Sequence, residues 1–275
     1  HFKLSWIGTT VEQITKLGYE NDIDGNPITN DEQLIELKMQ DVIIPFESAE
    51  YLVNVSKYVD FELQKFFGKQ PFYNLKNTQD LLGHLVIGLA PHTSVGITGR
   101  LIGYTKTHVC FASPIWHSAK RRDADGDADS VMLLLDALLN FSRQFLSDKI
   151  GGLMDAPLLI QPIVLPHEAQ TQAHNFEVAK EFPLEFYESS LNNEKSGDIR
   201  NIETLAMRKD TGDENIFYDH FFTHNTTTLT TSKSRSAYST LESMVDKLDL
   251  QIRNADIINA VETRDIVSYL IQTHL

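Results

Sequence analysis

The chain has 275 residues, of which 41% are hydrophobic and 23% are charged, and this composition excludes disordered and collagen-like chains. It carries 38 acidic and 24 basic residues, so its formal charge of −14 is opposite to the basic footprint of an independent nucleic-acid-binding domain. No apolar run approaches the roughly 20 residues of a membrane helix, and the single cysteine excludes a disulfide framework, so we expect a soluble, cytoplasmic protein.

Residues 1–76 are predicted to form a mainly helical scaffold. Two threonines at 9–10 precede apolar residues at helical spacing, and Gly18 follows them, which predicts a short capped helix. A turn is expected at 24–27, where Asp, Gly, Asn and Pro follow one another. Apolar residues at helical spacing across 47–67, closed by a glycine, predict a longer helix.

The residue pattern changes near residue 85, where β-branched and aromatic runs alternate with glycine and proline. This pattern predicts short strands of a barrel or compact sheet at 85–90, 95–104 and 108–112. Gly96 and Gly99 lie within one of these runs and indicate bulges or close backbone crossings.

The segment 130–145 is the most apolar part of the chain and is predicted to be a buried helix, with Asp129 or Ser130 as its N-cap. A further strand is expected at 157–166, and the polar segment 167–231 carries no clear pattern.

Helical periodicity returns in 236–261 and 263–275, so we expect C-terminal helices across 231–275. The chain starts at His1 without a leader pattern and stops within a helical pattern. We therefore interpret it as an internal piece of a larger polypeptide.

The most unusual segment is 120–129, which reads Lys-Arg-Arg-Asp-Ala-Asp-Gly-Asp-Ala-Asp. In an extended loop, residues two apart project to the same side, so the acidic side chains would converge: Asp123, Asp125, Asp127 and Asp129. Converging carboxylates repel one another unless a cation neutralises them, and Mg²⁺ binds such oxygen ligands together with substrate phosphates. The adjacent cations suit those phosphates: Lys120, Arg121 and Arg122. The segment indicates phosphoryl or nucleotidyl transfer.

Other interpretations of this loop stay open or fail on spacing. A solvated acidic turn that caps the next helix is the simplest alternative. A calcium EF-hand fails, because counting back from Gly126 puts Met132 at the position that needs an acid. The segment 127–131 matches an aspartyl-phosphatase motif, but basic residues precede it where that motif needs an apolar strand. The histidines show no paired zinc spacing, so we expect no zinc site.

Several runs of the sequence carry a family resemblance. The longest is Ala119 to Arg143, which contains the acidic loop. The others are Leu89 to Gly96, Gly99 to Tyr104, Met154 to Leu158, His1-Phe2, Leu82 to Gly88, Phe222 to His224 and Ser236 to Tyr238. Together they resemble the large subunit of archaeal DNA polymerase D, also called DNA polymerase II. The resemblance spans nearly the whole chain, although 170–218 matches only loosely.

The resemblance implies an α+β catalytic core built on double-psi β-barrels, with residues 77–230 as the barrel region. It assigns Asp125 and Asp127 as the catalytic aspartates that bind two Mg²⁺ ions, with Mn²⁺ as a possible substitute. Asp123 stands where the family usually has Asn and would add charge to the metal site, and Ala128 stands where Glu is usual. Phosphate contacts are expected from Lys120, Arg121, Arg122 and Arg100.

The implied function is DNA-directed DNA synthesis, by transfer of nucleotides to a primer 3′-hydroxyl. The implied partners are primer–template DNA, deoxynucleoside triphosphates, the rest of the large subunit with its first barrel, the small subunit with its 3′–5′ exonuclease, and a sliding clamp. We expect the isolated chain to be inactive. Two alternatives stay open: a non-catalytic assembly module of the polymerase, and an independent Mg²⁺-dependent phosphohydrolase.

Overall fold

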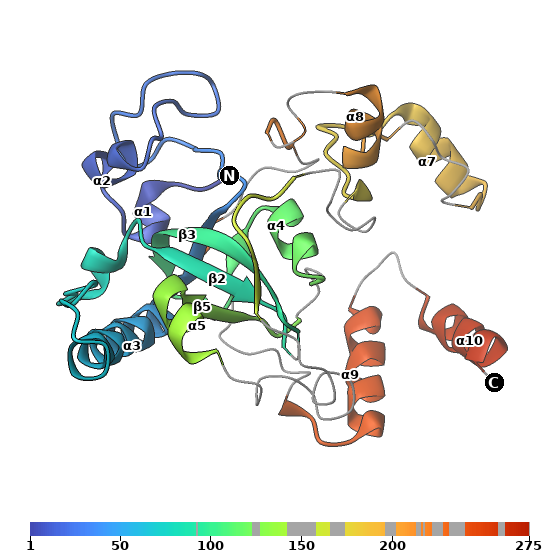
Figure 1. Cartoon of the computed structure of the whole chain (residues 1–275). Helices are drawn as coiled ribbons and strands as arrows, with labels where there is room; N and C mark the ends of the chain where they lie inside the picture. Colours follow the sequence, from blue (N-terminus) through green and yellow to red (C-terminus); the bar gives the residue numbers. More distant parts are fainter. Residues whose placement is uncertain are drawn as a thin grey trace. The chain divides into compact units, whose positions relative to one another are not determined.

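The computed structural model of the chain describes residues 1–91, 93–122, 127–141, 158–165, 174–195, 202–212, 216, 218–221, 228–230, 240–257 and 262–274 (Figure 1). The chain divides into two compact units, His1–Thr231 and Ser232–Leu275. The first unit contains both helices and a mixed sheet, which confirms the α+β class. No helix in the described part of the chain is long and apolar enough to cross a membrane.

Two of the N-terminal helices, α2 (Val11–Lys16) and α3 (Phe46–Lys65), form close to where the sequence predicts them, whereas α1 (Leu4–Ile7) was not predicted. At the start of α2, Thr10 and Gln13 form a reciprocal capping box. Gly18 has a φ of +88°, a conformation that favours glycine after a helix. The long helix α3 likewise precedes a glycine with positive φ, Gly68. The predicted turn forms as well, since Gly25 N donates to Asp22 O.

The strands are β1 (Asp41–Pro45), β2 (Leu85–Leu89), β3 (Val95–Thr105), β4 (Phe111–Ala112), β5 (Ser130–Leu133) and β6 (Leu159–Gln161). Their order in the sheet is β4-β1-β3-β2-β5, and β6 pairs with one end of β3. β1 and β6 run parallel to β3, whereas β2 runs antiparallel to it. In the described residues the sheet is open, with β4 and β5 at its edges. The strands predicted near 85–112 and 157–166 are thus confirmed, with shorter bounds for β4 and β6.

The strand β1 was not predicted and lies inside the stretch that was expected to be mainly helical. Its apolar run is too short to show a period, so its sequence alone does not separate a strand from a buried helix. The structure decides the matter through pairing, because β1 lies between β3 and β4 and its first four residues are buried.

The two faces of the sheet are covered by different segments. One face carries Val42, Val86, Ile97 and Leu101, which pack with residues of α3 and with Trp116. The N-terminal segment packs against one end of the other face, and α5 (Leu134–Asn140) with β6 packs against its opposite end. The sheet is therefore a buried platform from which the loops project.

The strand glycines mark close packing. A Cβ at Gly99 would lie 3.1 Å from the Trp116 ring, and one at Gly96 would lie 2.3 Å from an Ile87 methyl group. This confirms the close approach that the sequence indicated. The irregularity of β3 lies elsewhere, since Ile102 is the extra residue opposite β1.

The predicted helix at 130–145 is wrong in its first part. Residues 130–133 form β5, which pairs antiparallel with β2, and α5 begins only at Leu134. Neither Asp129 nor Ser130 is its N-cap, because that position belongs to Leu133. An apolar run of this kind is compatible with a strand as well as with a helix. Pairing with β2 makes residues 130–133 a strand. Residues 142–145 lie outside the described part.

The remaining elements of the first unit are the 3-10 helix η1 (Thr78–Leu81), α4 (Pro114–Ala119), α7 (Leu184–Leu191) and α8 (Leu205–Thr211). The second unit contains α9 (Met244–Asp256) and α10 (Thr263–His274), which confirms helical structure near the C-terminus.

Candidate functional site

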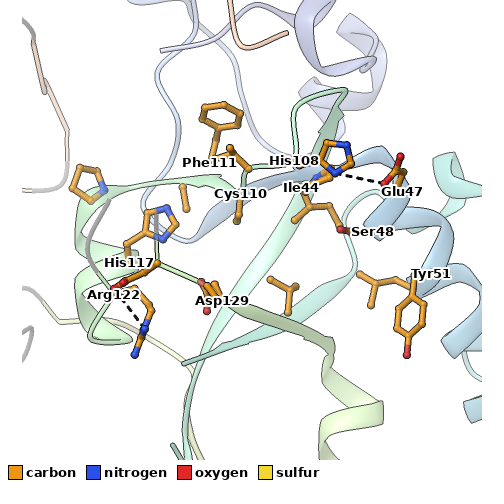
Figure 2. Close-up of a pocket in the computed structure, with 18 of the residues that line it drawn as sticks. Ile44, Glu47, Ser48, Tyr51, His108, Cys110, Phe111, His117, Arg122 and Asp129 are labelled. Carbon is orange, nitrogen blue, oxygen red and sulfur yellow. Dashed lines mark ion pairs between the residues drawn. The ribbon is translucent and has the colours of Figure 1, made fainter. Parts of the chain in front are cut away.

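A pocket of about 910 Å³ opens beside the acidic loop. Figure 2 shows Arg122, His117 and Asp129 on one side of it, and Glu47 with Tyr51 on the opposite side. Its lining also includes Asp127 and Ala128 from the loop. The pocket thus joins the stem of the acidic loop, which follows α4, to the first turns of α3.

The acidic loop is attached to the sheet at its first end through α4. Ser113 caps this helix and Pro114 occupies its first position, both common at helix starts. Trp116 lies in the middle of the helix, is fully buried, and donates from Nε1 to Thr98 O of β3 at 3.0 Å. Lys120 is the C-cap residue, so its position follows directly from that of Trp116.

Lys120 lies inside the protein and does not project into solvent. Its side chain has no exposed surface, its Nζ forms an ion pair with Asp129, and it lies 3.6 Å from the centroid of the Trp116 ring. Burial lowers the pKa of Lys120, while Asp129 opposes that shift. Asp129 lies at the start of β5, where Ser130 N donates to its Oδ1 at 2.9 Å.

A second ion pair joins Arg122 and Asp127, which lie between Lys120 and Asp129 in the sequence. Arg122 Nη1 is 3.5 Å from Asp127 Oδ2, and both side chains are partly exposed. Among the described residues no hydrogen-bond partner accepts from the buried Arg122 Nε. Arg121 adopts a φ of +62°, an uncommon conformation for a residue with a side chain, which turns the chain between the two cations. The two pairs are therefore nested around residues 123–126.

The predicted metal ligands are only partly described. Asp127 is described and lines the pocket, whereas Asp123 and Asp125 lie outside the described residues. Within the described ranges, no three Asp, Glu, His or Cys residues form a group that could hold a metal ion. Asp127 supplies the hard oxygen donor that Mg²⁺ prefers, so its chemistry fits the expected ion.

Two titratable groups near the loop, His117 and Cys110, are uncharged at neutral pH. Burial lowers the pKa of His117 to about 4, and the Lys120 charge contributes to the shift. Burial also raises the pKa of the Cys110 thiol to about 12. His117 therefore offers no positive charge to a substrate, and the local cations are the Lys and Arg residues of the loop stem.

Arg100 was predicted to contact phosphate, and the structure places it against a carboxylate. Its Nε and Nη2 donate to the two oxygens of Asp41 at 2.8 and 2.7 Å. Tyr19 donates to the same carboxylate at 2.6 Å. Arg100 does not line the pocket, so it lies apart from the cations of the acidic loop.

The pocket wall opposite the loop was not predicted from the sequence. There, His108 Nδ1 lies 3.5 Å from Glu47 Oε2 of α3. Ser48 and Tyr51 of α3 also line this wall (Figure 2). The α3 residues are separated from the acidic loop by a long stretch of chain. The pairing of β1 with β3 and β4 brings the start of α3 to the pocket, and no local pattern in the sequence indicates such pairing.

Comparison with known proteins identifies the family of this chain. Residues 1–247 match the family described as DNA polymerase II large subunit DP2, catalytic domain. Over the whole chain the sequence is 59% identical to the DNA polymerase II large subunit of Cenarchaeum symbiosum, 46% to that of Archaeoglobus fulgidus and 44% to that of Pyrococcus furiosus. The chain spans 25%, 24% and 22% of these relatives. It belongs to the family of the DNA polymerase II large subunit catalytic domain.

Proposed function

We propose that this chain supplies the metal-binding catalytic segment of a DNA-directed DNA polymerase. The observation that carries the proposal is the acidic loop of a family member opening onto a pocket, with Asp127 and Arg122 in the pocket wall. A carboxylate beside a guanidinium is the combination that a metal-bound triphosphate needs. The reaction is the transfer of a nucleotide to the primer 3′-hydroxyl, with release of pyrophosphate.

In this proposal Asp125 and Asp127 hold two Mg²⁺ ions, which Mn²⁺ can replace, and Asp123 adds negative charge. When bound, such ions polarise the reacting phosphate, favour the ionised 3′-hydroxyl and neutralise the leaving group. The carboxylate of Asp127 is 37% exposed at the pocket, so a hydrated cation can reach it. Asp125 lies two residues away, the spacing that puts two side chains on one side of an extended loop.

The loop arginines are the proposed phosphate contacts. The separation of 3.5 Å between Arg122 and Asp127 is long for a charge-assisted hydrogen bond, and exposed pairs of this kind contribute little energy. Arg122 can therefore exchange the carboxylate for a triphosphate when a cation occupies Asp127. Arg121, which is exposed, is a second contact.

The remaining parts of the polymerase supply what this acidic chain lacks. A chain with a net charge of −14 provides a poor surface for a DNA duplex, since affinity for DNA depends on neutralising phosphates. We infer that the first barrel of the large subunit completes the DNA cleft. The small exonuclease subunit and a sliding clamp are its other proposed partners. A double-psi β-barrel around the site and a cytoplasmic location stay our predictions.

The test is template-directed primer extension by the reconstituted two-subunit enzyme. We expect Asp125→Asn and Asp127→Asn each to abolish extension, because each replacement keeps the side-chain volume and removes one metal-binding charge. Asp24→Asn is the matched control, because Asp24 is an exposed aspartate in an acidic turn outside the pocket. Subunit assembly and DNA binding are measured on every variant.

The outcome separates the alternatives. Loss of extension with assembly and DNA binding intact supports the proposal. Extension that survives both substitutions would show that this segment is an assembly module. Hydrolysis of phosphoesters without template or primer, lost in the same variants, would instead identify a phosphohydrolase.

A further inference from the structure

The ion pair between Lys120 and Asp129 closes the acidic loop at its base. The two residues are nine positions apart, and every residue proposed to bind metal lies between them. The Lys120 side chain has no exposed surface, and that of Asp129 is only 14% exposed. A buried pair at the two stems of a loop restricts the loop far more than an exposed pair would.

Both partners of this pair are themselves tied to the sheet. The Lys120 ammonium group lies over the Trp116 ring, and Trp116 is hydrogen-bonded to β3. The Lys120 stem passes so close to β2 that a Cβ at Gly88 would lie 2.7 Å from its Cδ. On the other side, Asp129 is followed by Ser130, which pairs with Leu89 of β2. The two ends of the acidic loop are thus held in place by β2 and β3, the two central strands of the sheet.

We propose that the Lys120–Asp129 ion pair positions the carboxylate of Asp127, which lies two residues before Asp129, for metal binding. Lys120 is a positioning residue in this scheme, and it acts through Asp129 without contacting the substrate. This inference rests on the proposed function. It assigns Lys120 a different part from the phosphate contact that the sequence predicted, because a side chain with no exposed surface does not meet a phosphate.

The positive charge of Lys120 neutralises the Asp129 carboxylate. Asp129 lies two residues after Asp127, so in an extended segment its carboxylate points to the same side as the proposed metal ligands. Without a partner, that carboxylate would compete for the metal and distort the ligand set. Asp129 lines the same pocket as Asp127, and the Lys120 ammonium group pairs with its carboxylate, so that it does not serve as an additional metal ligand. Groups that orient metal ligands in this way typically change metal affinity or activity 10- to 100-fold when they are replaced.

The experiment uses Lys120→Met, Asp129→Asn and the double variant in the reconstituted two-subunit enzyme. Primer extension is titrated with Mg²⁺, and Mn²⁺ binding is followed by electron paramagnetic resonance, with Asp125→Asn as the baseline for ions bound elsewhere. For Lys120→Met we expect the Mg²⁺ concentration for half-maximal extension to rise at least tenfold and the Mn²⁺ affinity to fall by a similar factor. The KM for the nucleotide at saturating Mg²⁺ should stay within about twofold, because the phosphate contacts remain.

The double variant separates positioning from folding. Lys120→Met alone leaves a buried carboxylate unpaired and lowers stability, whereas removing both charges relieves that cost. We therefore expect the double variant to regain thermal stability but not the wild-type Mg²⁺ dependence. Lys57→Met, which removes an exposed lysine of α3, is the matched control and should leave the Mg²⁺ dependence unchanged.

Two results would overturn the positioning role. One is a Mg²⁺ and Mn²⁺ dependence of Lys120→Met equal to that of wild type, in an enzyme that Asp125→Asn inactivates. The other is a double variant that regains both stability and metal dependence, which would show that the pair only balances its own charges. Extension that survives Asp125→Asn would instead refute the proposed function itself, so the two failures are distinguishable.

Discussion

Two carboxylates near the sheet, Asp41 and Asp129, each pair with a cation, and the two ion pairs have different roles. Asp41 joins Arg100 across 59 positions of sequence and ties β1 to β3, with Tyr19 as a third member. Asp129 joins Lys120 across nine positions and closes one loop. The first pair has bidentate geometry, and the second pairs a compact ammonium group that also lies over an indole ring. The comparison teaches that a long-range pair fixes the scaffold, whereas a short-range pair fixes a site.

Arg100→Leu should give the largest loss of stability. It leaves the Asp41 carboxylate, which is 4% exposed, without its guanidinium partner. Removal of one member of a buried pair costs about 3–5 kcal/mol. Hydrogen exchange of β1 and β3 amides in the intact large subunit would measure this loss as a lower free energy of local unfolding. A change below about 1 kcal/mol would show that the pair does not hold the two strands together.

A pH titration distinguishes the Lys120 region from the Arg100 region through His117. The pKa of His117 is about 4 in the folded protein and 6.5 in the unfolded chain. As the pH falls between these values, only the unfolded chain binds the proton, so stability is lost in that window and levels off below it. The upper limit of the loss is about 3 kcal/mol.

The His117 prediction is measured by the same amide exchange, on the peptide that contains α4. His117→Gln should remove this part of the pH dependence and leave that of the β1 amides near Arg100 as it is. Equal slopes for wild type and variant would contradict the assigned pKa.

Gly88→Ala tests the close packing beneath Lys120. The new Cβ would lie 2.5 Å from the Trp116 ring and 2.7 Å from Lys120 Cδ, so one of these side chains must move. Overpacking of this kind costs about 1–3 kcal/mol. We expect a lower melting temperature than in wild type, and a higher Mg²⁺ concentration for half-maximal extension. A variant with normal stability would show that the ring and the lysine stem have free space.

Tyr19→Phe should have the smallest effect. It removes the hydroxyl that donates to Asp41 at 2.6 Å, while the Arg100 pair remains in place. The hydroxyl also accepts from Lys38 N at 3.1 Å, so this bond is lost as well. Loss of the hydrogen bond to the charged Asp41 costs about 1.5–3 kcal/mol, and the Arg100 partner that remains keeps this part near the lower value. Amide exchange of β1 would measure it. The Mg²⁺ dependence of extension should not change, because this region fixes the scaffold alone.

Local patterns in the sequence predicted α2 and α3, but not α1, α4, α7 or α8. The α2 helix carries its own cap in Thr10, and α3 shows apolar residues at helical spacing before a glycine. β2 and β3 were also predicted, since glycines interrupt β-branched runs there. β1 and β5 were not, because short apolar runs have no period that separates a strand from a helix.

For the site, the sequence by itself determined the chemistry. It placed the carboxylates and the cations within 120–129, and it carried the family resemblance, because both depend only on the order of residues along the chain. Only the tertiary structure decided which cation is buried and which faces the pocket. Lys120 and Arg122 are both basic residues of one loop stem, yet burial against Trp116 and Gly88 pairs the first with Asp129 and leaves the second beside Asp127. Burial depends on contacts between distant strands, which the local sequence does not encode.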